Sequence, residues 1–143
     1  METLKEVCTV LNNIPNINQG GCGIAALTLY KWLEKKNQLA DDTRIIYFYY
    51  DEYDYRSNIA INRSNKFKTL PAAPYHAVLY HKGCYIDSND MNYISTHKYS
   101  QKIKNIKFVI ESINNNTCNW NSSFDRNSVK DIESTLDIDL KLK

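Results

Sequence analysis

The sequence predicts an α+β protein in which a buried central helix packs on an antiparallel β-sheet. The first 36 residues contain two segments whose apolar residues recur at helical spacing. Segments rich in β-branched and aromatic residues follow, and Lys82-Gly83 separates two of them as the turn of a hairpin would. Helices that come early and strands that come late are typical of the α+β class.

Two helices are expected at the N-terminus. The first, over residues 2–11, is predicted by apolar residues three and four positions apart: Leu4, Val7, Cys8 and Leu11. The second begins at Cys22 and ends at about Lys36. Its apolar residues cover almost the whole helix circumference, so we expect its first turns to be buried.

The strands are expected in the middle of the chain. Residues 44–50, RIIYFYY, are β-branched and aromatic and predict a strand. A short helix over residues 57–61 and a loop over residues 62–74 come next. The hairpin then has its strands at residues 75–81 and 84–87.

The C-terminal part is expected to contain two strands and a helix. Residues 106–111 predict a strand, and the Asn-rich residues 114–123 predict an exposed loop. Ser128 and Asp131 have the spacing of a capping box at the start of a short helix. A last strand is predicted by apolar residues that alternate with charged ones: Leu136, Ile138, Leu140 and Leu142.

Length and charge limit the classes of function. A chain of 143 residues fits one domain, over residues 1–143, and no apolar run approaches the length of a membrane span. The net charge of +2 is too small to hold a polyanion, which argues against nucleic acid or a membrane surface as a partner. The charged N-terminus lacks the pattern of a signal peptide, so we expect a cytoplasmic protein.

The cysteines do not form a metal-binding pattern. Cys8, Cys22, Cys84 and Cys118 include no Cys-x-x-Cys pair, and only three histidines accompany them. We therefore expect reduced thiols, no metal and no cofactor.

Cys22 is the most informative of the four cysteines, because a Gly-Gly pair delivers it to the start of the buried helix. Free N–H groups and the positive end of the helix dipole stabilise an anion there, which predicts a lowered thiol pKa. The same N–H groups can bind a developing oxyanion if a side-chain amide adds a second donor. Three amides are near enough in sequence to do so: Asn16, Asn18 and Gln19.

A nucleophilic cysteine also needs a base, and His76 at the start of a strand is the best placed histidine. A two-residue turn at Lys82-Gly83 would put Asp87 diagonal to His76 on one face of the hairpin. A four-residue loop would put Asp87 directly opposite His76, and a three-residue loop would present Ser88 instead. With Asp87 as partner, the imidazole would be held in one tautomer, as in a Cys-His-Asp triad.

The segments NQGGCGIAALTLY and YHAVLYHKGCYIDSND resemble the papain-like cysteine peptidase superfamily, especially the bacteriocin-leader peptidases and the NlpC-type cell-wall amidases. The resemblance covers mainly residues 16–36 and 74–90. It implies a papain-like fold with Cys22 as nucleophile, His76 as base and Asp87 as the orienting residue.

The resemblance also implies a reaction: cleavage of an amide bond in a peptide, a protein or another substrate, through a thioester. The family's oxyanion-hole glutamine lies six residues before the cysteine, where this sequence has Asn16. Asn16 is therefore the preferred donor, and Gln19, three residues before the cysteine, is the second choice.

Three alternatives remain. An acyltransferase or transglutaminase-type enzyme would use the same residues with a different acyl acceptor. A non-catalytic interaction protein, for instance from a phage or a bacterium, would keep or merely mimic this pattern of residues. A zinc site at Cys22, His76 and Asp87 is a lesser alternative, because zinc ligands are rare at such a helix start.

Overall fold

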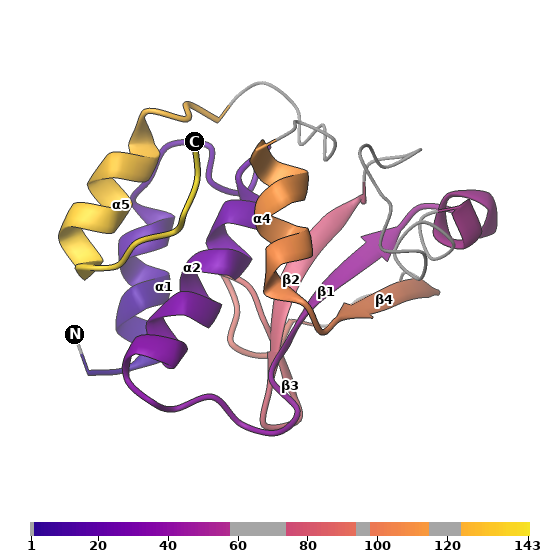
Figure 1. Cartoon of the computed structure of the whole chain (residues 1–143), viewed down its shortest axis with the longest axis horizontal. Helices are drawn as coiled ribbons and strands as arrows, with labels where there is room; N and C mark the ends of the chain where they lie inside the picture. Colours follow the sequence, from indigo (N-terminus) through magenta and orange to yellow (C-terminus); the bar gives the residue numbers. More distant parts are fainter. Residues whose placement is uncertain (1, 58–73, 94–97, 115–123) are drawn as a thin grey trace.

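The computed structural model describes residues 2–57, 74–93, 98–114 and 124–143. The predicted α+β class is confirmed. Four strands form an antiparallel sheet in the order β3-β2-β1-β4, and the labelled helices lie to one side of it (Figure 1). Helix α2 packs chiefly against β2 and carries the other helices on its outer side.

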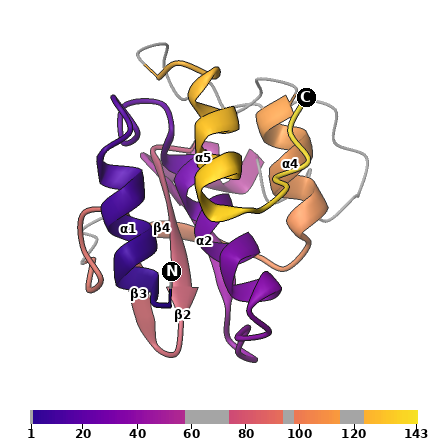
Figure 2. The ribbon, with the colours of Figure 1, turned by 90° about the vertical axis from the view of Figure 1, so that its left-hand side faces the viewer.

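The two N-terminal helices are confirmed. Helix α1 (Leu4–Asn12) is capped by Thr3, whose hydroxyl accepts the Glu6 N–H and donates to the Glu6 carboxylate. Helix α2 (Cys22–Lys35) is buried throughout its first two turns. Figure 2 shows α1 beside the segment that follows β3. There the Cys8 thiol donates to the Asp87 carbonyl at 3.6 Å.

The strand and the hairpin are confirmed as well. β1 (Arg44–Tyr49) pairs with β2 (His76–His81), and β2 pairs with β3 (Cys84–Ile86). Lys82 and Gly83 both have positive φ, 50° and 79°, which matches the two-residue turn of a hairpin. The register therefore follows the two-residue alternative.

Between residues 98 and 114 the sequence prediction misses one strand and assigns a helix as a strand. The edge strand β4 (Tyr99–Ile103) is absent from the sequence prediction, because its pattern combines one buried amide, at Gln101, with exposed polar residues. Residues 106–111 belong to a helix, α4 (Ile106–Asn114), and not to a strand. The Asn105 side chain accepts the Lys107 N–H at 3.0 Å, so a helix start overrides the β-branched composition.

The C-terminal region also differs in part. Helix α5 (Ser128–Leu136) is present, but its N-cap is Asn127, without a side-chain cap, so the predicted capping box is wrong. The predicted last strand is wrong: Leu136 is the last residue of α5, which the left-handed Asp137 ends, and residues 137–143 pair with no strand of the sheet. Leu140 is nevertheless buried, and its N–H bonds the Glu133 carboxylate at 2.9 Å.

The predicted helix at 57–61 lies outside the described residues except for Ser57, which is helical together with residues 52–56. The predicted loops over 62–74 and 114–123 also lie almost wholly outside the described residues. None of the helices in the described ranges is long and apolar enough to cross a membrane.

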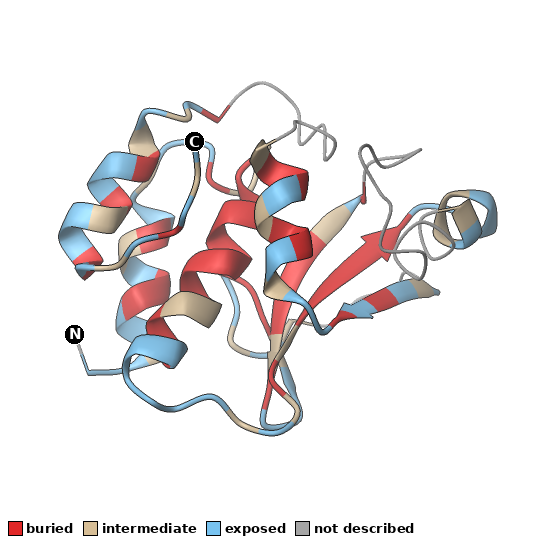
Figure 3. Cartoon of the chain, viewed as in Figure 1, coloured by how far each residue is buried: buried red, intermediate tan, exposed pale blue. Residues whose placement is uncertain are grey.

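Side chains of the sheet divide between two apolar clusters. Those on the α2 side join the main core, which is continuous over α2 and β1 (Figure 3). The opposite side has a smaller cluster built from Ile46, Phe48 and Val78 with partly buried tyrosines around it. This division matters for the site, because neighbouring residues of β2 face different clusters.

Candidate active site

Cys22 is the first residue of α2, and only 4% of it is exposed. The chain reaches it through Gly21, where a Cβ would lie 2.6 Å from the Ile17 carbonyl oxygen. A side chain at position 21 would thus collide with backbone. Close packing against backbone therefore explains why Gly21, the second glycine before Cys22, is a glycine.

His76 and Asp87 lie together across the hairpin. His76 Nε2 is 3.4 Å from Asp87 Oδ2, and both side chains are largely buried, with 13% and 11% exposed. The register His81 opposite Cys84 gives this diagonal relationship, as predicted for a two-residue turn. Because Nε2 faces the carboxylate, Nδ1 is the nitrogen that can accept a proton from elsewhere. The ring of Tyr93 packs against the imidazole, with centroids 5.2 Å apart.

Cys22 meets the same strand one residue farther on. The backbone N–H groups of Ala77, Gly23 and Cys22 itself lie near enough to the sulfur to lower its pKa. Strand alternation puts Ala77 on the α2 side of the sheet, whereas the His76 side chain belongs to the side of Val78. The sulfur and the imidazole thus approach the beginning of β2 from different sides, one residue apart in the backbone.

The electrostatics of Cys22 differ from the prediction. Burial raises the pKa of the Cys22 thiol to about 12, and the negative charge of Asp87 adds to the rise. The three N–H groups oppose it but are outweighed. The predicted lowering of the pKa is therefore wrong for this conformation. Because the helix start is buried, loss of solvation destabilises the charged thiolate more than the N–H groups stabilise it.

Asp87 is held as an anion. Burial by itself would raise the pKa of Asp87, but hydrogen bonds from His76, Asn89 and Asp90 hold it below its ordinary value. The two backbone N–H groups reach Oδ1 at 2.9 and 2.8 Å, which leaves Oδ2 to face the imidazole. A carboxylate so fixed can orient His76 and stabilise an imidazolium.

The predicted oxyanion donors lie in the loop before α2. Asn16 and Gln19 are both exposed, and Asn16 has a left-handed backbone, with φ 59°. Neither is drawn into the buried end of α2. Asn18 is the amide that contacts the site: its Nδ2 donates to Ser88 Oγ at 3.0 Å. Sequence spacing identified Asn18 as near Cys22, but it gave no reason to prefer it.

The described residues contain no group of three His, Cys, Asp or Glu side chains able to hold a metal ion. A cavity of about 150 Å³ lies beside the Asp87 turn, between α1 and Ser88, and Cys8 lines it. The Cys8 thiol is buried, which raises its pKa to about 11. Cys84 is exposed, and all three described cysteines are free thiols.

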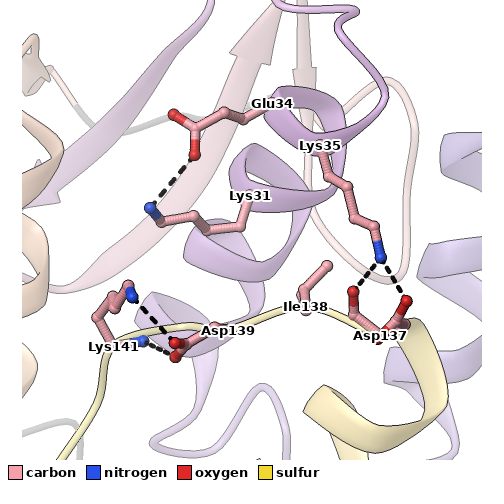
Figure 4. A pocket seen from close by; sticks show the side chains of 7 residues that line it. All are labelled: Lys31, Glu34, Lys35, Asp137, Ile138, Asp139 and Lys141. Atoms are coloured by element: carbon pink, nitrogen blue, oxygen red, sulfur yellow. Dashed lines mark hydrogen bonds and ion pairs between the residues drawn. The ribbon is translucent and has the colours of Figure 1, made fainter.

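A larger cavity of about 270 Å³ lies at the other end of α2, where the C-terminal segment crosses it (Figure 4). Three ion pairs line it: Lys31 with Glu34, Lys35 with Asp137, and Lys141 with Asp139. Helix α2 has 14 residues, so this cavity is about 20 Å from Cys22 and is no part of its site.

The tyrosine-rich segment has two roles in the fold. Tyr47 and Tyr49 are fully buried side chains of the core. Tyr50 and Tyr53 are exposed, and the ring of Tyr50 lies 5.7 Å from that of Tyr75, the residue before His76.

Comparison of this chain with protein-family models, with curated proteins and with solved structures finds no match.

Proposed function

We propose that the chain is a papain-like cysteine peptidase or amidase, which cleaves an amide bond through a thioester on Cys22. One observation carries the proposal. The sulfur at the start of a buried helix lies near the backbone N–H of Ala77, and the preceding residue, His76, is paired with Asp87. A candidate nucleophile at a helix start thus lies one residue along the strand from a histidine that has an orienting carboxylate, and these are the three groups that nucleophilic catalysis requires.

The proposed reaction begins with a neutral thiol, in keeping with its raised pKa. As the substrate carbonyl arrives, His76 Nδ1 takes the thiol proton and the sulfur attacks the carbonyl carbon. The backbone N–H of Cys22, at the start of the helix, would donate to the resulting oxyanion. The C–N bond breaks, and the amine leaves with the proton from His76. Water then hydrolyses the thioester, again with His76 as base, and the thiol is restored.

The demanding step is proton transfer between Cys22 and His76. Because the two side chains approach β2 from different sides, the imidazole must reach the sulfur around the first residue of the strand. The pairing with Asp87 Oδ2 directs Nε2 away from that route and leaves Nδ1 for it. Dependence of Cys22 chemistry on His76 is therefore the property that tests the proposal.

A second candidate is a non-catalytic interaction protein. The observation that favours it is the thiol itself, which is 4% exposed and has its pKa raised to about 12. Such a cysteine is typical of core packing. In this alternative Cys22 fills the junction between α2 and β2, and His76 and Asp87 stabilise the hairpin. An acyltransferase would share the first half of the proposed reaction and transfer the thioester to an amine.

The test uses 4-nitrophenyl acetate, a small activated ester that needs no specific binding site. We expect a burst of nitrophenolate, with the acetyl group found on the Cys22 peptide by mass spectrometry. His76→Ala should slow Cys22 acetylation by about 100-fold or more, the usual contribution of a general base. Addition of an amine such as glycylglycine then separates hydrolysis from acyl transfer.

Cys84 provides the matched control, because it is an exposed cysteine of the same chain. Its acetylation should be equal in the wild type and in His76→Ala. If Cys22 is acetylated no faster than Cys84, or equally fast in both proteins, the enzyme proposal is wrong and the interaction protein is favoured.

A further inference from the structure

We infer that Asn18 is a positioning residue, which fixes the loop before Cys22 on the turn that carries Asp87. The inference rests on the proposed function and adds a residue pair to it. Asn18 Nδ2 donates to Ser88 Oγ at 3.0 Å, and Ser88 Oγ lies 3.3 Å from Asn18 Oδ1. The bond in which the amide N–H donates to the hydroxyl oxygen is the shorter of these two contacts.

Burial indicates that this pair is built into the fold. Ser88 is only 2% exposed, so its hydroxyl has lost most of its contact with water and needs a protein partner. Asn18 provides that partner from a loop that is otherwise largely exposed. Removing the Asn18 side chain would leave the buried Ser88 hydroxyl without this hydrogen bond. That loss lowers the free energy of unfolding more than the loss of an exposed pair would.

The sheet register explains why this bond matters for the site. Leu79 lies opposite Ile86, so continuing the pairing puts Val78 opposite Asp87 and Ala77 opposite Ser88. Asp87 contacts His76, whereas Ser88 contacts Asn18 in the loop that leads into α2. Two consecutive residues thus serve the two halves of the site.

The Asn18–Ser88 bond therefore connects the loop that carries Cys22 with the turn that carries Asp87. Asn18 precedes Cys22 by four residues, and Ser88 follows Asp87 directly. The bond between them fixes the sulfur relative to the carboxylate that orients His76. The position of the reacting groups matters, because a shift of about 1 Å can lower the reaction rate by about 100-fold. Asn18 and Ser88 act through Cys22 and Asp87 and need not touch the substrate.

The experiment measures Cys22 acetylation by 4-nitrophenyl acetate from pH 5 to pH 10 in Asn18→Ala, Ser88→Ala and the double variant. We expect each single variant to lose at least 10-fold and to shift the midpoint of the pH profile. The double variant should be no slower than the slower single one, because both changes remove the same link. Asn92→Ala, an exposed asparagine beyond the turn, is the matched control and should keep the wild-type profile.

The outcomes separate this inference from the proposed function. If acetylation depends on His76 but Asn18→Ala and Ser88→Ala keep the wild-type rate and pH profile, the positioning role is wrong and the enzyme stands. Losses that multiply in the double variant also contradict a shared link. If wild-type acetylation does not depend on His76, the proposed function fails and the positioning role fails with it. Thermal melts of every variant show whether a slow variant is folded.

Discussion

Gly21 lies directly against the aromatic ring of Phe124, so that a Cβ at position 21 would be 2.8 Å from Cδ2 of the ring. The segment before α5 thereby packs on the residue that precedes Cys22. The C-terminal part of the chain, which has no candidate catalytic residue, thus helps to hold the start of α2 in place.

Gly21→Ala should therefore destabilise the protein. The new methyl group would meet the Phe124 ring and the Ile17 carbonyl oxygen, and overpacking of this kind costs about 1–3 kcal/mol. Urea unfolding measures the loss. In Gly21→Ala with Phe124→Leu, stability should return only in part, because the Ile17 contact is with backbone and stays. An unchanged unfolding midpoint in Gly21→Ala would show that the loop moves aside freely.

The parts of the fold that could be predicted are those whose local pattern agrees with their packing. The apolar residues of α1 mark one buried face, and those of α2 mark a helix that is buried on nearly all sides. The Lys82-Gly83 turn fixes the register of the hairpin. The register in turn predicts the diagonal of His76 and Asp87. Local chemistry was enough for each of these features.

The failures arise where tertiary contacts decide. Residues 106–111 contain β-branched residues, but the side chains on the core side, including Val109 and Ile113, recur at helical spacing. β4 is held by β1 and has little apolar pattern of its own. The pKa of Cys22 is the clearest case, because the sequence displays the helix N-terminus but not the depth at which it is buried.

Buried thiols should make the protein less stable in alkali. The pKa of Cys22 is raised to about 12 and that of Cys8 to about 11, whereas an unfolded thiol titrates near pH 8.5. Above about pH 8.5 the unfolded chain loses these protons and the folded chain keeps them. The free energy of unfolding should then fall by up to about 1.4 kcal/mol per pH unit for each thiol.

Urea unfolding of the wild type and Cys8→Ala between pH 7 and pH 10.5 measures this slope. The variant is less stable at pH 7 because it leaves a cavity, but its slope above pH 8.5 should be about half that of the wild type. Equal slopes would contradict the raised pKa of Cys8.

His81 should make the stability of the protein depend on pH in the acidic range. Burial lowers the pKa of His81, nearby Lys82 lowers it further, and Asp42 partly opposes both. Thr43 Oγ1 accepts the Ala40 N–H at 2.8 Å, so its own hydrogen can donate to His81 Nδ1, 2.7 Å away. The fold thus favours the neutral imidazole. Its stabilising effect is complete above the unfolded pKa of about 6.5 and is lost as the pH falls below that value.

Unfolding at pH 7.5 and at pH 5 should show this loss in the wild type and a smaller loss in His81→Gln, which cannot titrate. Thr43→Val is a useful companion, because it removes the bond to Nδ1 and keeps the shape of the side chain. If the wild type and His81→Gln lose stability equally between these pH values, another group causes the loss.

Asp87 has a structural role and a proposed catalytic role, and two substitutions separate them. Asp87→Asn keeps an oxygen that can accept the N–H groups of Asn89 and Asp90, but it removes the charge that faces His76. Asp87→Ala removes both. We therefore expect Asp87→Ala to lose about 1.5–3 kcal/mol, the range for hydrogen bonds to a charged group, and Asp87→Asn to lose clearly less.

Acetylation of Cys22, unlike stability, should be slowed in both Asp87 variants. Both variants lose the carboxylate that orients the imidazole and stabilises its charged form, so both should slow His76-dependent acetylation by 10-fold or more. Combining His76→Ala with Asp87→Asn should add little further loss, since the two residues act as a unit. A stable Asp87→Asn protein that is acetylated at the wild-type rate would restrict Asp87 to its role in the turn.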